Sequence, residues 1–156
     1  MDSKWKEKWQ EIKKRKTLLT SDIIKFTKMQ VTNNIFGLNF SEKFICGRSR
    51  SSFKFLKDKT IWFPNFTSHK DWENHLSDDG IFYEKYIGKE KLEQFKKLNP
   101  EEPHRKDREK NRNIYAFAKY EDGSYRFKGV FKFIENKDLV FIYEKISDEL
   151  NLNYED

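Results

Sequence analysis

A short basic segment, GRSRSSFK, carries the side chains whose chemistry is the most specific in this sequence. Arg48, Arg50 and Lys54 alternate with glycine, serine and phenylalanine, beginning at Gly47. Small neighbours let a phosphate approach backbone N–H groups, while the cationic side chains neutralise its charge. The segment therefore predicts contacts to a phosphate backbone, with Arg48, Arg50 and Lys54 as the contacting residues.

Aromatic side chains meet the second requirement for binding nucleic acid, because bases stack on them. Trp62, Trp72 and Tyr125 are the candidate stacking residues, and Trp62 or Tyr125 is expected to border a base-accepting pocket. Arg126 and the lysines that follow it could track a phosphate backbone. Each side chain also has a purely structural interpretation, because aromatic residues are more often core and charges on edge strands prevent aggregation.

Metal-dependent hydrolysis is the competing chemistry. A nuclease of this kind needs an acidic residue, then Glu-x-Lys on a strand, to hold a divalent ion and position water. Glu-x-Lys occurs at Glu11–Lys13, in a predicted helix, and at Glu135–Lys137, in a predicted turn. His69 and His75 are spaced poorly for one helix face. We therefore predict no metal or cofactor, and a binding protein rather than an enzyme.

Composition places the chain among folded, basic domains. Its 156 residues fit one domain, and its 15 Phe, 7 Tyr and 4 Trp argue against disorder despite a charged fraction of 37%. The net charge of +6 suits an anionic partner, although lysines that merely solvate the surface would produce the same value.

The single cysteine, Cys46, excludes an internal disulfide and a CxxC metal site. We find no signal peptide, lipidation motif or apolar run of membrane length. The cytoplasm is therefore the expected location, and no membrane partner is expected.

The elements that must position these residues centre on Ile114–Tyr143. Runs of aromatic and β-branched residues are separated there by Asp122-Gly123, a strong hairpin signal, and by a second polar turn. They predict a three-stranded meander. Strict alternation predicts an inward aromatic face and an outward basic face: Tyr125, Phe127, Gly129, Phe131 and Phe133 against Arg126, Lys128, Val130 and Lys132.

The remaining elements follow from periodicity and turn signals. They are helices over 2–16, 20–29, 68–76 and 92–98, two strands over 35–45 with a bulge at Gly37, a hairpin over 53–63, a strand over 81–85 and a helical turn over 145–150. The expected division is a helical part (1–30), a β-rich body (31–145) and an acidic tail (146–156) in one domain. The fold class is α+β: N-terminal helices, then a strongly bent, mostly antiparallel sheet or a partly closed barrel.

The first predicted helix carries one narrow apolar stripe. Trp5, Trp9 and Ile12 follow helical spacing. The stripe either packs on the domain or binds a protein partner. A protein-interaction module is therefore a further function class.

Three segments resemble a known family. NIYAFAKYEDGSYRFKGVFKF (Asn113–Phe133), WFPNF (Trp62–Phe66) and ENHLSDDGIFYEKY (Glu73–Tyr86) resemble parts of uncharacterised bacterial domains associated with restriction systems. Their layout is similar to PUA-like modules, which include the SRA and EVE domains that recognise modified bases. The resemblance implies a small β-barrel that reads nucleic acid, by accepting a flipped base in an aromatic pocket. It assigns no site residue.

Together these observations favour a nucleic-acid-binding domain, with DNA favoured over RNA, that recognises modified or flipped bases in prokaryotic restriction or defence. A metal-dependent nuclease or other hydrolase and a protein-interaction module are the alternatives.

Overall fold

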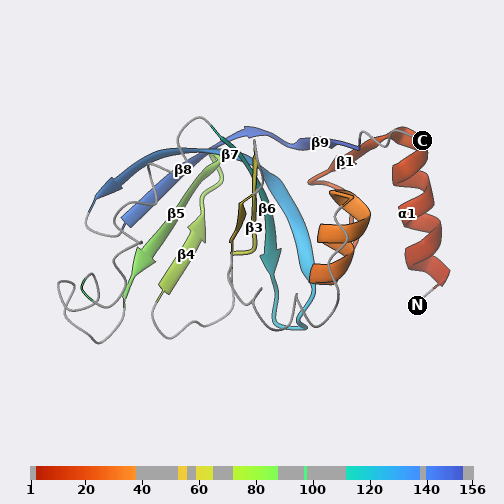
Figure 1. The fold of residues 1–156 in the computed structure, drawn as a ribbon, viewed down its shortest axis with the longest axis horizontal. Coiled ribbons are helices and arrows are strands. Elements are labelled where there is room, and N and C mark those ends of the chain that lie inside the picture. The colour runs from red at the N-terminus through yellow and green to blue at the C-terminus, as the bar shows by residue number, and fades with distance from the viewer. Residues whose placement is uncertain are drawn as a thin grey trace.

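The structure, a computed structural model, describes residues 3–37, 53–55, 59–64, 72–87, 97, 112–137 and 140–152. A curved sheet fills the middle of the molecule and α1 stands at one end (Figure 1). The elements are α1 (Ser3–Arg15), β1 (Thr17–Leu19), the π-helix η1 (Gln30–Ile35), β2 (Phe53–Phe55), β3 (Lys59–Trp62), β4 (Trp72–Leu76), β5 (Ile81–Tyr86), β6 (Asn113–Lys119), β7 (Tyr125–Lys137), β8 (Val140–Ser147) and β9 (Glu149–Asn151).

The main sheet has seven strands in the order β2-β3-β6-β7-β8-β5-β4, and β1 pairs with β9 in a separate two-stranded sheet. Of the described pairs, β3 and β6 are parallel and the others are antiparallel. The predicted α+β class with a mostly antiparallel sheet is therefore confirmed. The sheet remains open instead of closing into a barrel.

The predicted C-terminal meander is confirmed in β6, β7 and β8. Gly123 adopts φ +81° in the β6–β7 turn, a conformation that glycine accepts without strain. The backbone N–H of Ser124 donates to the Asp122 carboxylate at 3.0 Å, which fixes the turn before β7 begins.

A bulge at Lys128 divides β7 into two parts. The alternation of side chains between the two faces of the sheet is reversed from one part to the next. Ala116 pairs with Gly129, but the next residue, Phe117, pairs with Phe127, so Lys128 has no partner across the ladder. Gly129 there has φ +129°. One extra residue reverses the alternation of all side chains beyond it. The prediction of one aromatic face and one basic face along β7 is therefore wrong.

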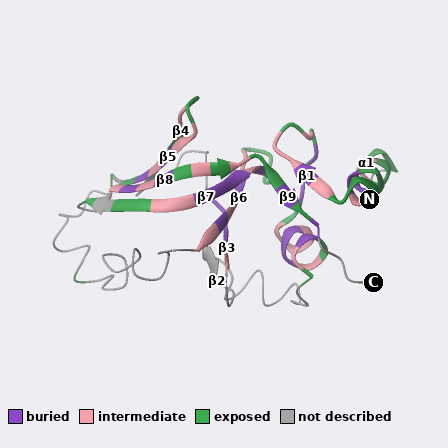
Figure 2. Cartoon of the chain, turned by 90° about the horizontal axis from the view of Figure 1, so that it is seen from above, coloured by how far each residue is buried: buried purple, intermediate pink, exposed green. Residues whose placement is uncertain are grey.

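The reversal gives the sheet a hydrophobic core on each side. Phe117, Phe127 and Val130 pack on one side, with the N-terminal segments. The other core, on what we call the concave face, is formed by Trp62, Phe82, Ile114, Ala116, Phe131, Phe141 and Tyr143. Figure 2 shows the buried stretches of β3, β6 and β7 side by side in the middle of the molecule.

Contacts between distant strands show that the sheet is bent. The ring centroid of Trp62 on β3 lies 4.4 Å from that of Phe82 on β5 and 4.5 Å from that of Tyr143 on β8. In a flat sheet β3 and β5 would be about 19 Å apart, four strand spacings of about 4.8 Å. The sheet therefore curls around the Trp62 side, which makes that face concave, and the predicted strong bend is confirmed.

Helix α1 packs its apolar stripe on the chain's own segment of residues 20–27, which we call the strap. Trp9 and Ile12 are buried, and the rings of Trp5 and Trp9 meet the edge of Phe26 at 6.1 and 5.7 Å. A protein partner for this stripe stays a prediction, but the tryptophans are already packed against Phe26.

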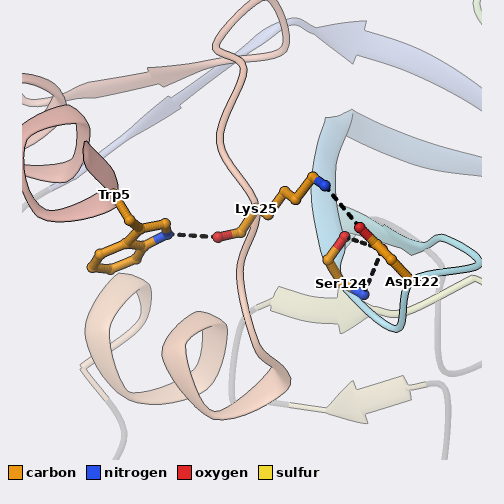
Figure 3. A network of polar contacts seen from close by, with 4 residues as sticks. All are labelled: Trp5, Lys25, Asp122 and Ser124. Carbon is orange, nitrogen blue, oxygen red and sulfur yellow. Dashed lines mark hydrogen bonds and ion pairs between the residues drawn. The ribbon is translucent and has the colours of Figure 1, made fainter. Parts of the chain in front are cut away.

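The strap connects α1 to the tip of the β6–β7 hairpin (Figure 3). The Trp5 indole N–H donates to the carbonyl of Lys25 at 2.6 Å, and Lys25 Nζ lies 2.8 Å from an Asp122 carboxylate oxygen. Next to this pair, Phe26 and Tyr125 exchange backbone hydrogen bonds of 2.9 and 2.8 Å. Helix, strap and hairpin thus form one connected unit.

Local patterns failed where tertiary pairing competes with them. The predicted helix over 20–29 is wrong over residues 20–27, because the strap contains no helical residue and leaves Ile23 87% exposed; only residues 28–29 are helical. The predicted helix over 68–76 is wrong in its described part, because Trp72–Leu76 is strand β4, paired with β5. The helical turn over 145–150 is wrong as well, because β8 and β9 cover these residues.

The segment before β2 also differs from its prediction. Ile35, the first residue of the two strands predicted over 35–45, ends the π-helix Gln30–Ile35, and Gly37, with φ +67°, follows that helix instead of forming a bulge. The rest of the predicted strands, residues 38–45, lies outside the described residues. The hairpin over 53–63 and the strand over 81–85 are confirmed. The helix predicted over 92–98 lies outside the described residues apart from Lys97.

Replacing Gly129 tests the bulge. A Cβ there would lie 3.0 Å from Lys145 Cε and 3.1 Å from the Ser147 carbonyl oxygen, at a φ of +129°. We expect Gly129→Ala to lower the free energy of unfolding by about 1–3 kcal/mol, measured by urea denaturation. Gly123→Ala is the control, because its positive φ has no neighbour within 4 Å. Equal losses in the two variants would contradict a packed bulge.

Asp122 makes stability depend on pH. Hydrogen bonds from Lys25 and Ser124 lower the pKa of its carboxyl group. A carboxyl group whose pKa is lower in the folded state stabilises the protein at pH values above its unfolded-state pKa. This stabilisation is lost as the pH falls toward the folded-state pKa. Asp122→Asn should therefore melt at a lower temperature than the wild type at about pH 5, and this difference in Tm should shrink as the pH is lowered to about pH 2. Glu121→Gln is the matched control, and a pH-independent deficit of Asp122→Asn would refute the linkage.

Candidate nucleic-acid interface

Polar side chains share the concave face with its aromatic core. Asn74 on β4 pairs with Glu84 on β5, which pairs with Phe141 on β8, so these three residues form one row across the sheet. Phe82 and Tyr143 belong to the next row. An amide and a carboxylate are thereby held beside aromatic rings.

Glu84 is 5% exposed, and no other Asp, Glu, Lys or Arg in the described part of the chain is buried to this extent. Burying a carboxylate costs several kcal/mol, so such groups are retained where they bind something or hold a structure in one arrangement. Thr60, fully buried on β3, lies in the row of Ile114 and Phe131 on the same face. The concave face therefore offers hydrogen-bonding groups in an otherwise apolar environment.

A hollow of about 530 Å³ adjoins Asn74 at the edge of this face. It is lined by the β4–β5 turn region and by two lysines: Asn74, His75, Leu76, Ser77, Asp78, Lys128 and Lys145. Lys145 Nζ lies 3.1 Å from Asp148 Oδ1 and lowers the pKa of that carboxyl group. Lys128 reaches this hollow because the bulge releases it from the ladder. We call it the cationic hollow, because two lysines line it together with the Asn74 amide and a single carboxylate, that of Asp78.

A second hollow, of about 370 Å³, lies between η1, β6 and β9. Phe36 and Tyr115 meet edge to face there, with ring centroids 5.4 Å apart. Its polar lining includes Lys59, Asn113 and Asn151. Its lining includes no buried charged residue, so it is a weaker candidate than the first hollow for binding a specific polar ligand.

The sequence-predicted residues are distributed differently. Arg48 and Arg50 lie outside the described residues. Lys54 is placed by its backbone in β2, opposite Ile61, and Trp72 by its backbone at the start of β4, two residues before Asn74. Their roles stay predictions.

Trp62, Tyr125 and Arg126 are placed with their side chains. Trp62 is fully buried between Phe82 and Tyr143, so a base could reach its ring face only by displacing one of these rings. Tyr125 is half-buried on the other side of the sheet, where its ring meets Phe63 at 5.2 Å, and burial raises the pKa of its hydroxyl group.

Arg126 lies over the Tyr120 ring, with its guanidinium carbon 4.3 Å from the ring centroid, and Lys128 Nζ lies 5.7 Å from the same centroid. Stacking on Tyr120 holds the arginine in place while the guanidinium edges can still meet a phosphate. Arg126 is linked to the cationic hollow through Tyr120, because the same ring is contacted by Lys128, which lines the hollow.

Sequence reasoning missed Asn74 and Glu84. The signal was present in FYEKY, since Glu84 shares its face with Phe82 two residues earlier. A charged residue in register with a core aromatic marks either a strand edge or a buried functional group. The bulge hid Lys128 in a different way, because strict alternation gave it an ordinary outward position.

The metal alternative gains no support from the described side chains. No group of three or more His, Cys, Asp or Glu within them could hold a metal ion. Glu11–Lys13 lies in α1, and His69 is outside the described residues. Glu135–Lys137 ends strand β7, so the turn predicted there is wrong. In the part of the chain that the structure covers, no helix is long and apolar enough to cross a membrane.

Comparisons with known proteins agree with this geometry. The model of the family described as "SET and RING associated domain" (SRA) matches residues 11–152. No curated protein matches the sequence. A solved structure titled "The 5-Hydroxymethylcytosine-Specific Restriction Enzyme AbaSI" superposes with a TM-score of 0.65 at 21% identity, covering 97% of this chain and 47% of that chain. At this identity the likeness shows a shared fold, and the chain spans about half the length of that enzyme.

Proposed function

The chain belongs to the SRA family, a DNA-binding family, as the resemblance in its sequence predicted, and from this membership we propose that it binds a modified cytosine flipped out of duplex DNA. The proposed site is the concave face at Asn74 and Glu84, entered through the hollow that Lys128 and Lys145 line. The observation that supports it most is the buried carboxylate of Glu84 beside an amide on an aromatic face.

The hydrogen-bonding groups match the edge of cytosine. A carboxylate accepts from the exocyclic N4 amino group of cytosine, and an amide both donates and accepts. Glu84 and Asn74 therefore offer the partners that a flipped cytosine loses when it leaves its pair. Trp62, Phe82 and Tyr143 provide the apolar wall, and Trp72, two residues before Asn74, is the proposed stacking residue.

The magnitudes are compatible with flipping. Extruding a base costs a few kcal/mol. Stacking on an aromatic side chain contributes about 1–3 kcal/mol, and a well-placed bidentate contact contributes about 1–3 kcal/mol of discrimination. Together they offset the cost, and a polar group on C5 of the base adds a further contact that ordinary cytosine lacks.

The substrate class and setting follow from the structural neighbour. Its title names 5-hydroxymethylcytosine and a restriction enzyme. We propose the same class of base, a cytosine with a hydroxymethyl substituent, and a prokaryotic restriction or defence setting. Lys128, Lys145 and Arg126 are the proposed phosphate contacts, joined by Arg48, Arg50 and Lys54 from the basic segment.

Substitution of Glu84 tests the site. We expect Glu84→Gln to weaken binding of the hydroxymethylated duplex about 10- to 100-fold, since the lost contact to the N4 amino group is worth about 1–3 kcal/mol. Fluorescence anisotropy with matched labelled duplexes measures both affinities. Glu73→Gln is the control, because Glu73 is exposed and lies next to Asn74 on the other face of β4.

A second readout separates recognition from folding. A 2-aminopurine opposite or beside the modified base should brighten when wild-type protein extrudes the base and stay dim with Glu84→Gln. Equal affinity of the wild type for modified and unmodified duplexes would refute modified-base recognition. An unchanged affinity of a folded Glu84→Gln variant for the modified duplex would move the site away from the concave face.

A further inference from the structure

Positive charge is concentrated in the first helix and the residue that follows it. Ser3–Lys16 contains seven Lys and Arg residues and two acidic residues, Glu7 and Glu11. Its net charge is therefore +5, and the net charge of the whole chain is +6. The last helical turn is basic, which suits the negative end of the helix dipole. The dipole does not account for Lys6 in the first half of the helix.

The lysines lie on both flanks of the buried stripe. Helical spacing puts Lys4 and Lys8 on one flank and Lys6 and Lys13 on the other. Glu7 lies three residues after Lys4, and Glu11 lies three residues after Lys8. These glutamates compensate the positive charge of that flank. Lys13 has no acidic residue three or four positions away, and Lys6 has Asp2 alone, which precedes the described helix. With Lys16, these two lysines form what we call the cationic flank.

The helix holds this flank in a fixed position. Trp9 and Ile12 are buried, and the Trp5 indole bonds to the strap. At the other end, the backbone N–H of Leu152 donates to the carbonyl of Lys16 at 2.9 Å. Both ends of α1 are therefore tied to the domain, so the lysines are presented by a rigid support and lose less freedom on binding than those of a mobile tail.

Through the strap, α1 is also connected to the proposed interface. Lys25 pairs with Asp122 at the tip of the β6–β7 hairpin, and Arg126 and Lys128 follow on β7. Basic residues thus run from the helix along one connected unit to the cationic hollow. This continuity favours a partner that extends beyond the hollow and carries regularly spaced negative charge.

We propose that Lys6, Lys13 and Lys16 bind the phosphate backbone of the duplex that flanks the recognised base. The proposal rests on DNA binding by the domain and adds a second contact that is independent of sequence and modification. Lys6 precedes the region matched by the family model, which begins at residue 11, whereas Lys13 and Lys16 lie within it.

The test compares two double variants with the same change in net charge. Lys6→Glu/Lys13→Glu alters the cationic flank, and Lys4→Glu/Lys8→Glu alters the compensated flank of the same helix. For each, affinity is measured against salt concentration with modified and unmodified duplexes, after circular dichroism confirms folding. Because each neutralised phosphate contributes about 0.9 to the slope of log K against log salt, the first variant should lower the slope by about 2. The second should change it far less.

The outcomes separate this proposal from base recognition. A reduced slope with an unchanged preference for the modified duplex supports the flank as a backbone contact. Equal effects of the two double variants, or none, overturn it, whatever happens to base preference. Loss of binding to phosphatidylserine vesicles with unchanged DNA binding would assign the flank to an anionic membrane and also overturn it. A wild type that prefers no duplex but keeps the variant-sensitive slope would refute base recognition alone.

Discussion

The structure depends on one extra residue in β7. Lys128 interrupts the pairing of β7 with β6, and the side chains from Gly129 to Phe133 change sides. Without this reversal, Phe127 and Phe131 would face the same way and β7 would not contribute to both cores. The close approach of Gly129 to the Ser147 carbonyl allows β7 and β8 to pack at the bulge. Lys128, the extra residue of the bulge, also lines the cationic hollow.

Curvature makes one face of the sheet concave, and this is the face that we propose as the binding site. Trp62 touches Phe82 although three strands lie between β3 and β5. A face curled to this degree surrounds what lies on it, so Asn74 and Glu84 are directed toward a shared apolar space. The proposed electrostatic contacts are of two kinds. The buried carboxylate can form a specific hydrogen bond to a base, whereas the exposed lysines can contact phosphates, which occur in any DNA. Specificity and affinity are thus assigned to different surfaces of one small domain.

The sequence predicted what local signals control. Asp122-Gly123 and Pro64 mark real turns and strand ends, and the Trp5/Trp9 spacing marks a real helix. The resemblance to PUA-like modules, confirmed as SRA membership, predicted the DNA-binding role, but the small β-barrel that it implied is an open sheet. The strap was mistaken for a helix because its hydrogen bonds go to distant residues such as Tyr125. Glu84 was overlooked because its burial depends on the bend of the sheet, which no single strand encodes.

The central claim is that the concave face receives a base. A crystal structure of the protein with a duplex that contains one hydroxymethylcytosine tests it most directly. The account predicts that this base lies outside the helix stack, with its N4 amino group within hydrogen-bonding distance of the Glu84 carboxylate. A base that remains stacked in the duplex, or one bound on the opposite face near Phe36 and Tyr115, would contradict it.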